Sequence, residues 1–127
     1  MSLNFFRRRK ILRRLNTLDA TPVRSCRHET DKDGHVMVVV PKFRKDWINE
    51  TFLRSRPRNF RVKLDESGTA TWLLIDGSRT VNEICKQLEQ QMGDEVQPVE
   101  ERVSKFMSVL YEQRYITFKE LSENHIK

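Results

Sequence analysis

The stretch "VKLDESGTATWLLIDGSRTVNEIC", residues 62–85, decides the fold, because its acidic residues admit two interpretations. Asp65, Glu66 and Asp76 could form a catalytic strip, or they could mark the ends of helices. Asp65 follows an alternating segment and stands where the first N–H groups of a helix need a capping oxygen. Asp76 precedes Gly77, which can adopt the left-handed backbone that ends a helix, and Glu66 is expected to face water. Catalytic carboxylates need a shared pocket and shifted pKa values, so we favour the structural interpretation.

Three helices are predicted from Asp65 onward. In the first we expect a run of buried side chains, namely Trp72, Leu73, Leu74 and Ile75. The second begins at a capping box of the form T-x-x-E and has an apolar stripe of Val81, Ile84, Cys85, Leu88 and Met92. Pro98 suits the first turn of the third helix, whose apolar stripe is Val99, Val103, Phe106, Leu110 and Tyr111. A short strand at residues 114–118 follows.

The N-terminal side of the same stretch predicts a β-hairpin. Asp33-Gly34 is a strong turn signal, because glycine adopts a positive φ without a Cβ clash, and it separates residues 23–30 from residues 35–43. Pro41 should end the second strand, since proline has no N–H to donate to the ladder. Residues 42–58 are expected to form a short helix or an ordered loop.

Residues 59–64 have the pattern of a half-buried third strand. Apolar and basic side chains alternate along it: Phe60, Val62 and Leu64 against Arg61 and Lys63.

These elements predict an α+β fold. We expect a winged-helix-like domain in which a small antiparallel β-sheet, a hairpin plus a third strand, is followed by three helices and a short terminal strand. A length of 127 residues with 37% apolar side chains suits one domain. We assign residues 21–118 to this domain, residues 1–20 to a basic N-terminal arm or helix, and residues 119–127 to a C-terminal tail.

The net charge of +6 is distributed unevenly. Residues 1–64 hold 17 Lys and Arg against 6 Asp and Glu, a net +11, whereas residues 65–127 hold 7 against 12, a net −5. Such asymmetry is typical of a basic surface with an anionic partner. No apolar run approaches the roughly 18 to 20 residues of a membrane span, and no apolar segment of a secretory signal follows the N-terminal charges. We therefore expect a cytoplasmic protein.

No constellation of residues proposes chemistry. His28, His35 and His125 are scattered, and no cysteine or acid triplet joins them at metal-ligand spacing. Neither a glycine-rich phosphate loop nor a nucleophile elbow is present. The two cysteines are widely separated, and Cys85 lies on the apolar stripe of the second helix, so a buried, inert thiol is expected. The sequence predicts no catalytic residue, no metal and no cofactor, and thus a protein that is not an enzyme.

The ordered motifs resemble the PqqD-like family. The matching features are L-D-x-x-G-x-x-x-W-x-L-x-D-G at residues 64–77, T-V-x-E-I at residues 80–84, and a third helix that ends in a Y-I strand. They cover roughly residues 58–118. This family comprises chaperones of pyrroloquinoline-quinone biosynthesis and the wider class of elements that recognise ribosomally made, post-translationally modified precursor peptides.

The resemblance implies a non-catalytic peptide-binding module. In such domains the leader of a precursor peptide adds as an extra strand to the third strand and lies in a groove against the third helix. The module then presents the peptide to a radical SAM enzyme or another modifying enzyme. Carried over to this sequence, the edge is residues 59–64 and the helix is residues 98–113. The predicted peptide-binding residues are Phe60, Arg61, Val62, Lys63 and Leu64 on the strand and Arg102, Lys105 and Phe106 on the helix.

Two interpretations of Arg61 and Lys63 stay open. Their charges could attract an acidic leader, with an effect mainly on the rate of association and on register. Charged side chains on an edge strand also deter aggregation between strands.

Two other functions are consistent with the charge. A winged-helix-like fold with a pI near 9.6 also suggests a DNA-binding transcriptional regulator. However, residues 98–114 have no net charge and residues 80–92 carry −1, so neither helix suits a polyanion and nucleic acid is not the favoured partner. The arm "FFRRRKILRR", residues 5–14, could contact an anionic membrane surface. The sequence does not specify an oligomeric state.

Overall fold

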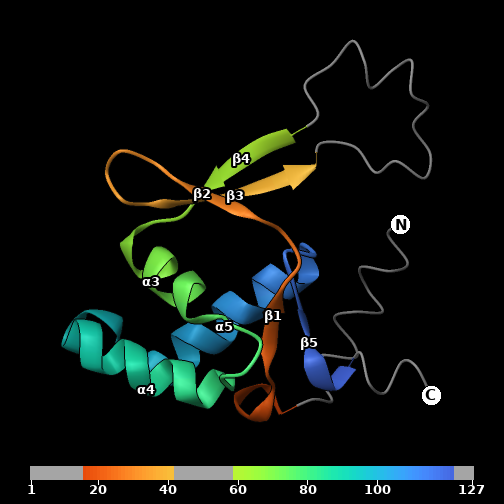
Figure 1. Cartoon of the computed structure of the whole chain (residues 1–127). Helices are drawn as coiled ribbons and strands as arrows, with labels where there is room; N and C mark the ends of the chain where they lie inside the picture. Colours follow the sequence, from red (N-terminus) through yellow and green to blue (C-terminus); the bar gives the residue numbers. More distant parts are fainter. Residues whose placement is uncertain (1–15, 42–58, 122–127) are drawn as a thin grey trace.

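The computed structural model describes residues 16–41 and 59–121 (Figure 1). In chain order its elements are η1 (Thr17–Asp19), β1 (Pro22–Arg24), β2 (His28–Thr30), β3 (Val36–Pro41), β4 (Asn59–Lys63), α3 (Glu66–Leu74), α4 (Val81–Met92), η2 (Gly93–Val96), α5 (Val99–Glu112) and β5 (Ile116–Phe118). The predicted α+β fold is confirmed, and the described strands and helices follow the predicted order with one additional strand, β1, at the start. The predictions for residues 1–15, 42–58 and 122–127 lie outside the described residues.

Three strands form one antiparallel sheet in the order β2-β3-β4. The predicted turn joins β2 to β3, and Gly34 within it has a φ of 88°, a value that favours glycine. Asp31 accepts hydrogen bonds from the backbone N–H groups of Asp33 and His35, each at 2.9 Å, which closes the turn. The strand pair β3–β4 ends where Pro41 faces Asn59.

The two remaining strands form a separate sheet. β1 pairs with β5 in antiparallel register, and Val23 faces Thr117 (Figure 1). The prediction of one continuous strand over residues 23–30 was therefore wrong. The Ser25 N–H donates to the Tyr115 carbonyl, whereas the Arg27 carbonyl accepts from Val39, so the chain crosses from one sheet to the other within two residues. The strand at residues 114–118 was predicted, but its pairing with residues 22–24 has no signal in the local pattern of either segment.

The helices begin where the capping signals place them. The Asp65 carboxylate accepts from the Gly68 N–H at 2.8 Å, and Thr80 and Glu83 form a reciprocal capping box. Asp76 accepts from the N–H groups of the two residues that follow Gly77. The catalytic interpretation of the acidic stretch thus loses its support, since Asp65 and Asp76 bind backbone N–H groups and Glu66 is exposed. Pro98 is the N-cap of α5 rather than a residue of its first turn.

One core lies between the β2-β3-β4 sheet and the helices. Its largest fully buried side chains include Trp72, Phe118, Ile75, Ile84, Met107 and Leu110. The predicted stripes of α4 and α5 are largely buried, although Met92 and Phe106 are only partly covered. The expectation for Leu73 was wrong, because this side chain is 50% exposed and points away from the face that holds Trp72. Met107, which the predicted stripe omitted, is fully buried.

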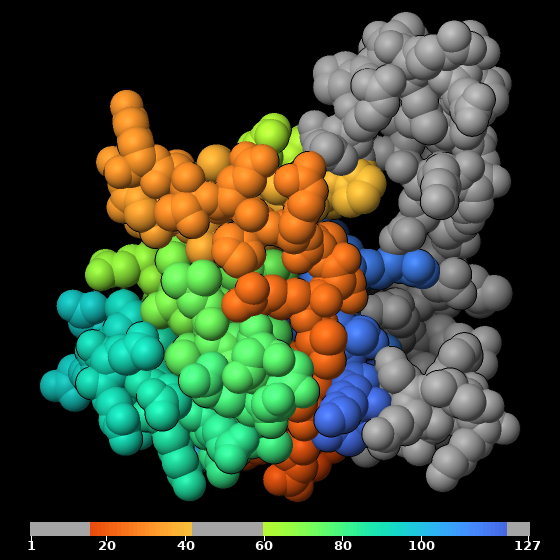
Figure 2. Space-filling model, viewed as in Figure 1, coloured from red at the N-terminus to blue at the C-terminus, as the bar shows by residue number. Residues whose placement is uncertain are grey.

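The β2–β3 hairpin is stacked over α3 and α4 (Figure 2). β1 lies next to β5, near the C-terminal end of the described residues. The packed body includes residues that flank positions 21–118. Ala20 is fully buried, and Glu120 accepts hydrogen bonds from the N–H and the hydroxyl of Thr21, each at 2.8 Å. Within residues 16–41 and 59–121, no helix combines the length and the apolar character that a membrane span requires.

Candidate functional site

β4 is an edge strand within the part of the chain that the structure describes. The Leu64 N–H donates to the Val36 carbonyl at 2.9 Å, and Val62 faces Val38 in the same register. Backbone groups alternate in direction along an antiparallel strand. Residues 60, 62 and 64 therefore turn their N–H and C=O groups toward β3, while Arg61 and Lys63 turn theirs toward the outer edge.

The side chains of β4 divide between the two faces of the sheet. Leu64 is buried and Val62 packs against the core, whereas Phe60 is 47% exposed on the same face. Arg61 and Lys63 lie on the opposite face and are exposed. The apolar and basic alternation predicted from the sequence is thus present, with Phe60 left partly open to solvent.

The cations of β4 are paired across the sheet with acids of the β2 segment. Arg61 Nε donates to Glu29 Oε1 at 2.7 Å, and Lys63 Nζ lies 3.2 Å from Asp31 Oδ2. The hydrogen bond from Arg61 lowers the pKa of Glu29. Sequence reasoning missed both pairs, because β2 and β4 are not neighbours and their long side chains reach across β3. These partners reduce the positive potential that Arg61 and Lys63 present to solvent.

A groove of about 460 Å³ opens beside the C-terminal end of β4, between α3 and α5. Its apolar lining comes from α5, with one residue each from α4 and η2: Val103, Phe106, Val109, Leu88 and Val96. Its polar lining consists of Asp65, Ser67, Thr71, Arg102 and Lys105. All three helix residues predicted from the resemblance, Arg102, Lys105 and Phe106, therefore line this groove.

Gly68 brings the strand end and the helix together. A Cβ at this position would lie 3.3 Å from Leu64 Cβ and 3.5 Å from Phe106 Cζ. The absence of a side chain at Gly68 therefore lets the end of β4 approach α5. Among the predicted strand residues, Leu64 is the one that lies near Gly68, as Phe106 does. Phe60 lies at the other end of β4.

Sequence reasoning missed part of the groove. Val109 is 47% exposed, and it is three residues after Phe106 on the same helix. An apolar residue beside the buried stripe was the available signal, since such a residue widens the apolar face of a helix beyond what the core covers. Asp65, Ser67 and Thr71 carried no signal of this kind.

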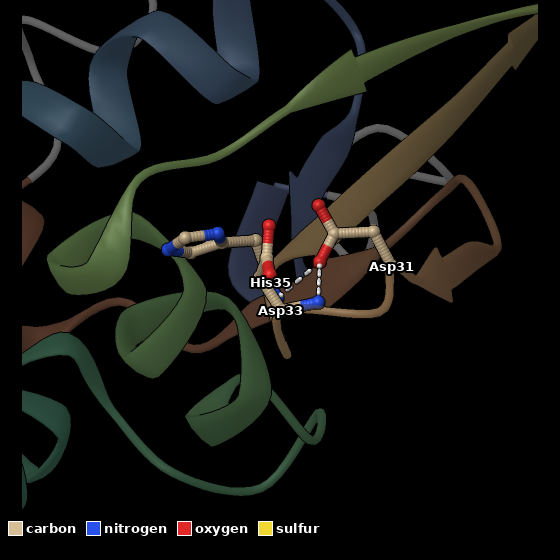
Figure 3. Close-up of side chains that lie close together, drawn as sticks. All are labelled: Asp31, Asp33 and His35. Carbon is tan, nitrogen blue, oxygen red and sulfur yellow. Dashed lines mark hydrogen bonds between the residues drawn. The ribbon is translucent and has the colours of Figure 1, made fainter.

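Asp31, Asp33 and His35 gather at the β2–β3 turn, with potential metal-ligating atoms within 4.8 Å of one another (Figure 3). The sequence analysis, which looked for a cysteine or an acid triplet that joins the three histidines, did not identify this group of two acids and one histidine. Asp31 Oδ1 already accepts two backbone hydrogen bonds, and Oδ2 pairs with Lys63. These contacts, first among them the hydrogen bond from the His35 N–H, lower the pKa of Asp31. The cluster is explained by the closure of the turn.

The prediction for Cys85 is confirmed. Its side chain is 2% exposed, and burial raises the pKa of the thiol to about 11. A thiol of this kind is protonated at neutral pH and does not act as a nucleophile.

Comparison with protein families gives one match. Residues 54–116 match the model of the PqqD family, described as Coenzyme PQQ synthesis protein D. The matched region contains β4, the three α-helices and the groove between α3 and α5. Comparisons with curated proteins and with solved structures found no match. Residues 54–116 thus assign this chain to the PqqD-like family, as its motifs predicted.

Proposed function

We propose that this protein is a non-catalytic peptide chaperone that captures the leader of a ribosomal precursor peptide. The leader adds as a strand to the outer edge of β4, and the domain presents the peptide to a modifying enzyme, of the radical SAM class by analogy with the family. The proposal rests chiefly on the position of β4, whose outward N–H and C=O groups have no neighbouring strand among the described residues.

The charge of the helices favours a peptide over DNA. Within their observed bounds, α4 holds Glu83, Glu89 and Lys86, and α5 holds three glutamates against Arg102 and Lys105, so each helix has a net charge of −1. Phosphate attraction supplies most of the non-specific affinity of a DNA-binding protein. A helix with net negative charge would repel the backbone that it has to approach.

Proline substitution tests the strand edge directly. Peptides are selected from a displayed random library against the wild-type protein, and the affinity of the best clone is measured by fluorescence anisotropy. Arg61→Pro removes an outward N–H and should abolish binding, because a guest strand loses a main-chain partner at the centre of β4. Arg61→Ala is the matched control, since it removes the same side chain but keeps the N–H, and it should retain binding within about threefold.

A second measurement follows the backbone itself. In amide hydrogen exchange, the N–H groups of Arg61 and Lys63 should exchange rapidly in the free protein and slowly with the peptide bound. The N–H of Val62, which faces β3, should be protected in both states. Binding that leaves the exchange of Arg61 and Lys63 unchanged, or equal affinity of Arg61→Pro and Arg61→Ala, would contradict strand addition at this edge.

A further inference from the structure

One side of α3 is open to solvent. Its residues Glu66, Ala70 and Leu73, which we call the outer stripe, are spaced i, i+4 and i+7 and therefore lie on one side of the helix. Glu66 is exposed and Leu73 is 50% exposed, whereas Ala70 is partly buried. An exposed leucine beside a small residue gives an apolar surface that another helix can approach closely.

The outer stripe lies on the opposite side of α3 from the groove. The α3 residues that line the groove are Ser67, Gly68 and Thr71. With about 3.6 residues per turn, Leu73 is about 200° from Thr71 around the helix axis. Figure 2 shows α3 at the surface of the viewed face, below the β2–β3 hairpin and beside α4. A partner on the outer stripe therefore leaves the groove uncovered.

The two ends of the outer stripe carry opposite charges. Glu66 is at the N-terminal end and forms no ion pair with a described residue. At the C-terminal end, Arg24 and Arg79 donate to the last two carbonyls of α3, at 3.3 and 3.1 Å. Arg79 also pairs with Asp76, whereas Arg24 has no carboxylate partner among the described residues and its buried Nε has no acceptor. Because backbone carbonyls already hold both guanidinium groups, a carboxylate that binds them costs little side-chain entropy.

We infer that the outer stripe binds a second copy of this chain, with the two α3 helices antiparallel about a twofold axis. Ala70 of each copy then faces Leu73 of the other, so that the small side chain leaves room for the large one. The same register places Glu66 opposite the end of α3 in the other copy, where Arg24 and Arg79 are held. A twofold interface needs a surface that is complementary to itself, and the outer stripe has this property in shape and in charge.

The dimer should be weak and reversible. α3 has 9 residues and is about 14 Å long, so its outer side offers less than the roughly 800 Å² per partner of a standard interface. We expect a Kd on the order of 100 μM. Each contact occurs twice about a twofold axis, so one substitution changes the interface at two places.

Sedimentation equilibrium at concentrations up to about 1 mM tests the dimer without any peptide, so the result does not depend on the proposed function. Leu73→Glu should weaken self-association by about tenfold or more, because it places two charges at the apolar centre of the interface. Val109→Glu is the matched control, since Val109 is 47% exposed but lines the groove instead, and it should leave self-association unchanged. Circular dichroism verifies that both variants keep the fold.

An exchange of charges tests the register. Glu66→Arg and Arg79→Glu should each weaken self-association by about fivefold, because like charges then face each other. A mixture of the two variants in equal amounts should recover the association of the wild type, since each new charge meets an opposite one. A wild-type protein that stays monomeric at about 1 mM, equal effects of Leu73→Glu and Val109→Glu, or a mixture without recovery would overturn the inference.

Discussion

At the scale of single residues, Trp72 links the sheet to the helices. Its indole N–H donates to His28 Nδ1 at 3.1 Å, and the Arg24 guanidinium lies 5.7 Å above its ring. The acceptor in this bond is an unprotonated nitrogen, so a proton on His28 Nδ1 would break it. Burial, and next the positive charge of Arg24, lower the pKa of His28.

This lowered pKa makes stability sensitive to acid. The unfolded chain takes up a proton near the ordinary histidine pKa of 6.5, whereas folded His28 does so only at lower pH. The contribution of His28 to the free energy of unfolding should therefore be fully present above pH 6.5, and it should be lost as the pH falls from 6.5 through the pKa of the folded state. Urea titrations at a series of pH values measure how steeply the free energy of unfolding depends on pH. His28→Gln should reduce this dependence. A His28 pKa at or above 6.5 in the folded protein, measured by NMR, would contradict the prediction.

Cys85 provides a second test at this scale. Because the thiol is 2% exposed with a pKa near 11, iodoacetamide should leave it unmodified in the folded protein and alkylate it in urea. Intact-mass spectrometry with peptide mapping at about pH 8 checks this prediction, and Cys85→Ala supplies the background signal. Rapid modification of Cys85 without denaturant would mean that α4 opens locally.

Residue roles were predictable where the partner is close in sequence. The capping by Asp65 and Thr80 follows from groups within three residues of each. The hydrogen bond from Trp72 to His28 spans 44 residues, and the exposure of Leu73 depends on which face of α3 the sheet covers. Neither of these has a local signature.

At the scale of elements, the junction of β4 and α3 depends on one hydroxyl. Thr69 Oγ1 accepts the Val36 N–H at 2.9 Å and lies 3.4 Å from the Leu64 carbonyl, to which it donates. It thereby bridges β3 and β4 at the end of their ladder. The N-terminal turn of α3 is in this way bonded to the sheet against which it packs.

Removal of this hydroxyl should destabilise the fold. Thr69→Val leaves the Val36 N–H buried without an acceptor, which costs about 1 to 3 kcal/mol. Thr71→Val is the matched control on the same helix, because Thr71 is also buried but donates only to a carbonyl within α3. Urea denaturation should show the larger loss for Thr69→Val. Equal losses would mean that the hydroxyl does not support the junction.

The elements themselves differed in how well they could be predicted. The helices and the β2–β3 hairpin have strong local signals, and their positions are confirmed. The division of residues 23–30 between two sheets could not be predicted, because β1 finds its partner more than 90 residues away in the chain. Likewise, the groove depends on the packing angle of α3 against α5, which no periodicity of either helix specifies.

At the scale of the whole molecule, the β1–β5 sheet completes the core. The family-matched region ends at residue 116, yet Phe118 is fully buried and its ring lies 5.3 Å from that of Tyr111. Residues outside the family match, including Ala20, Val36 and Val38, are also fully buried. The matched region is therefore only part of the folding unit.

Truncation of Phe118 should accordingly affect the entire domain. Phe118→Ala removes a fully buried ring and should lower the free energy of unfolding by about 3 to 5 kcal/mol in a single transition. Thr117→Ala is the control in the same strand, since this side chain is only half-buried, and it should cost about 1 kcal/mol or less. Circular dichroism and tryptophan fluorescence in urea should give coincident curves for both variants. Two separate transitions would show that β1 and β5 form an independent unit.

The pairing of Pro22 with Phe118 also has a consequence for protein architecture. The chain enters the described domain and leaves it through adjacent backbones, and directly opposed residues in antiparallel strands have Cα atoms about 4.5 to 5.5 Å apart. The two ends of a surface loop in an enzyme are similarly close together. The domain could therefore be inserted into such a loop without distorting the structure of the enzyme. Evolution or an engineer could thus tether this module beside a catalytic centre as readily as keep it a separate protein.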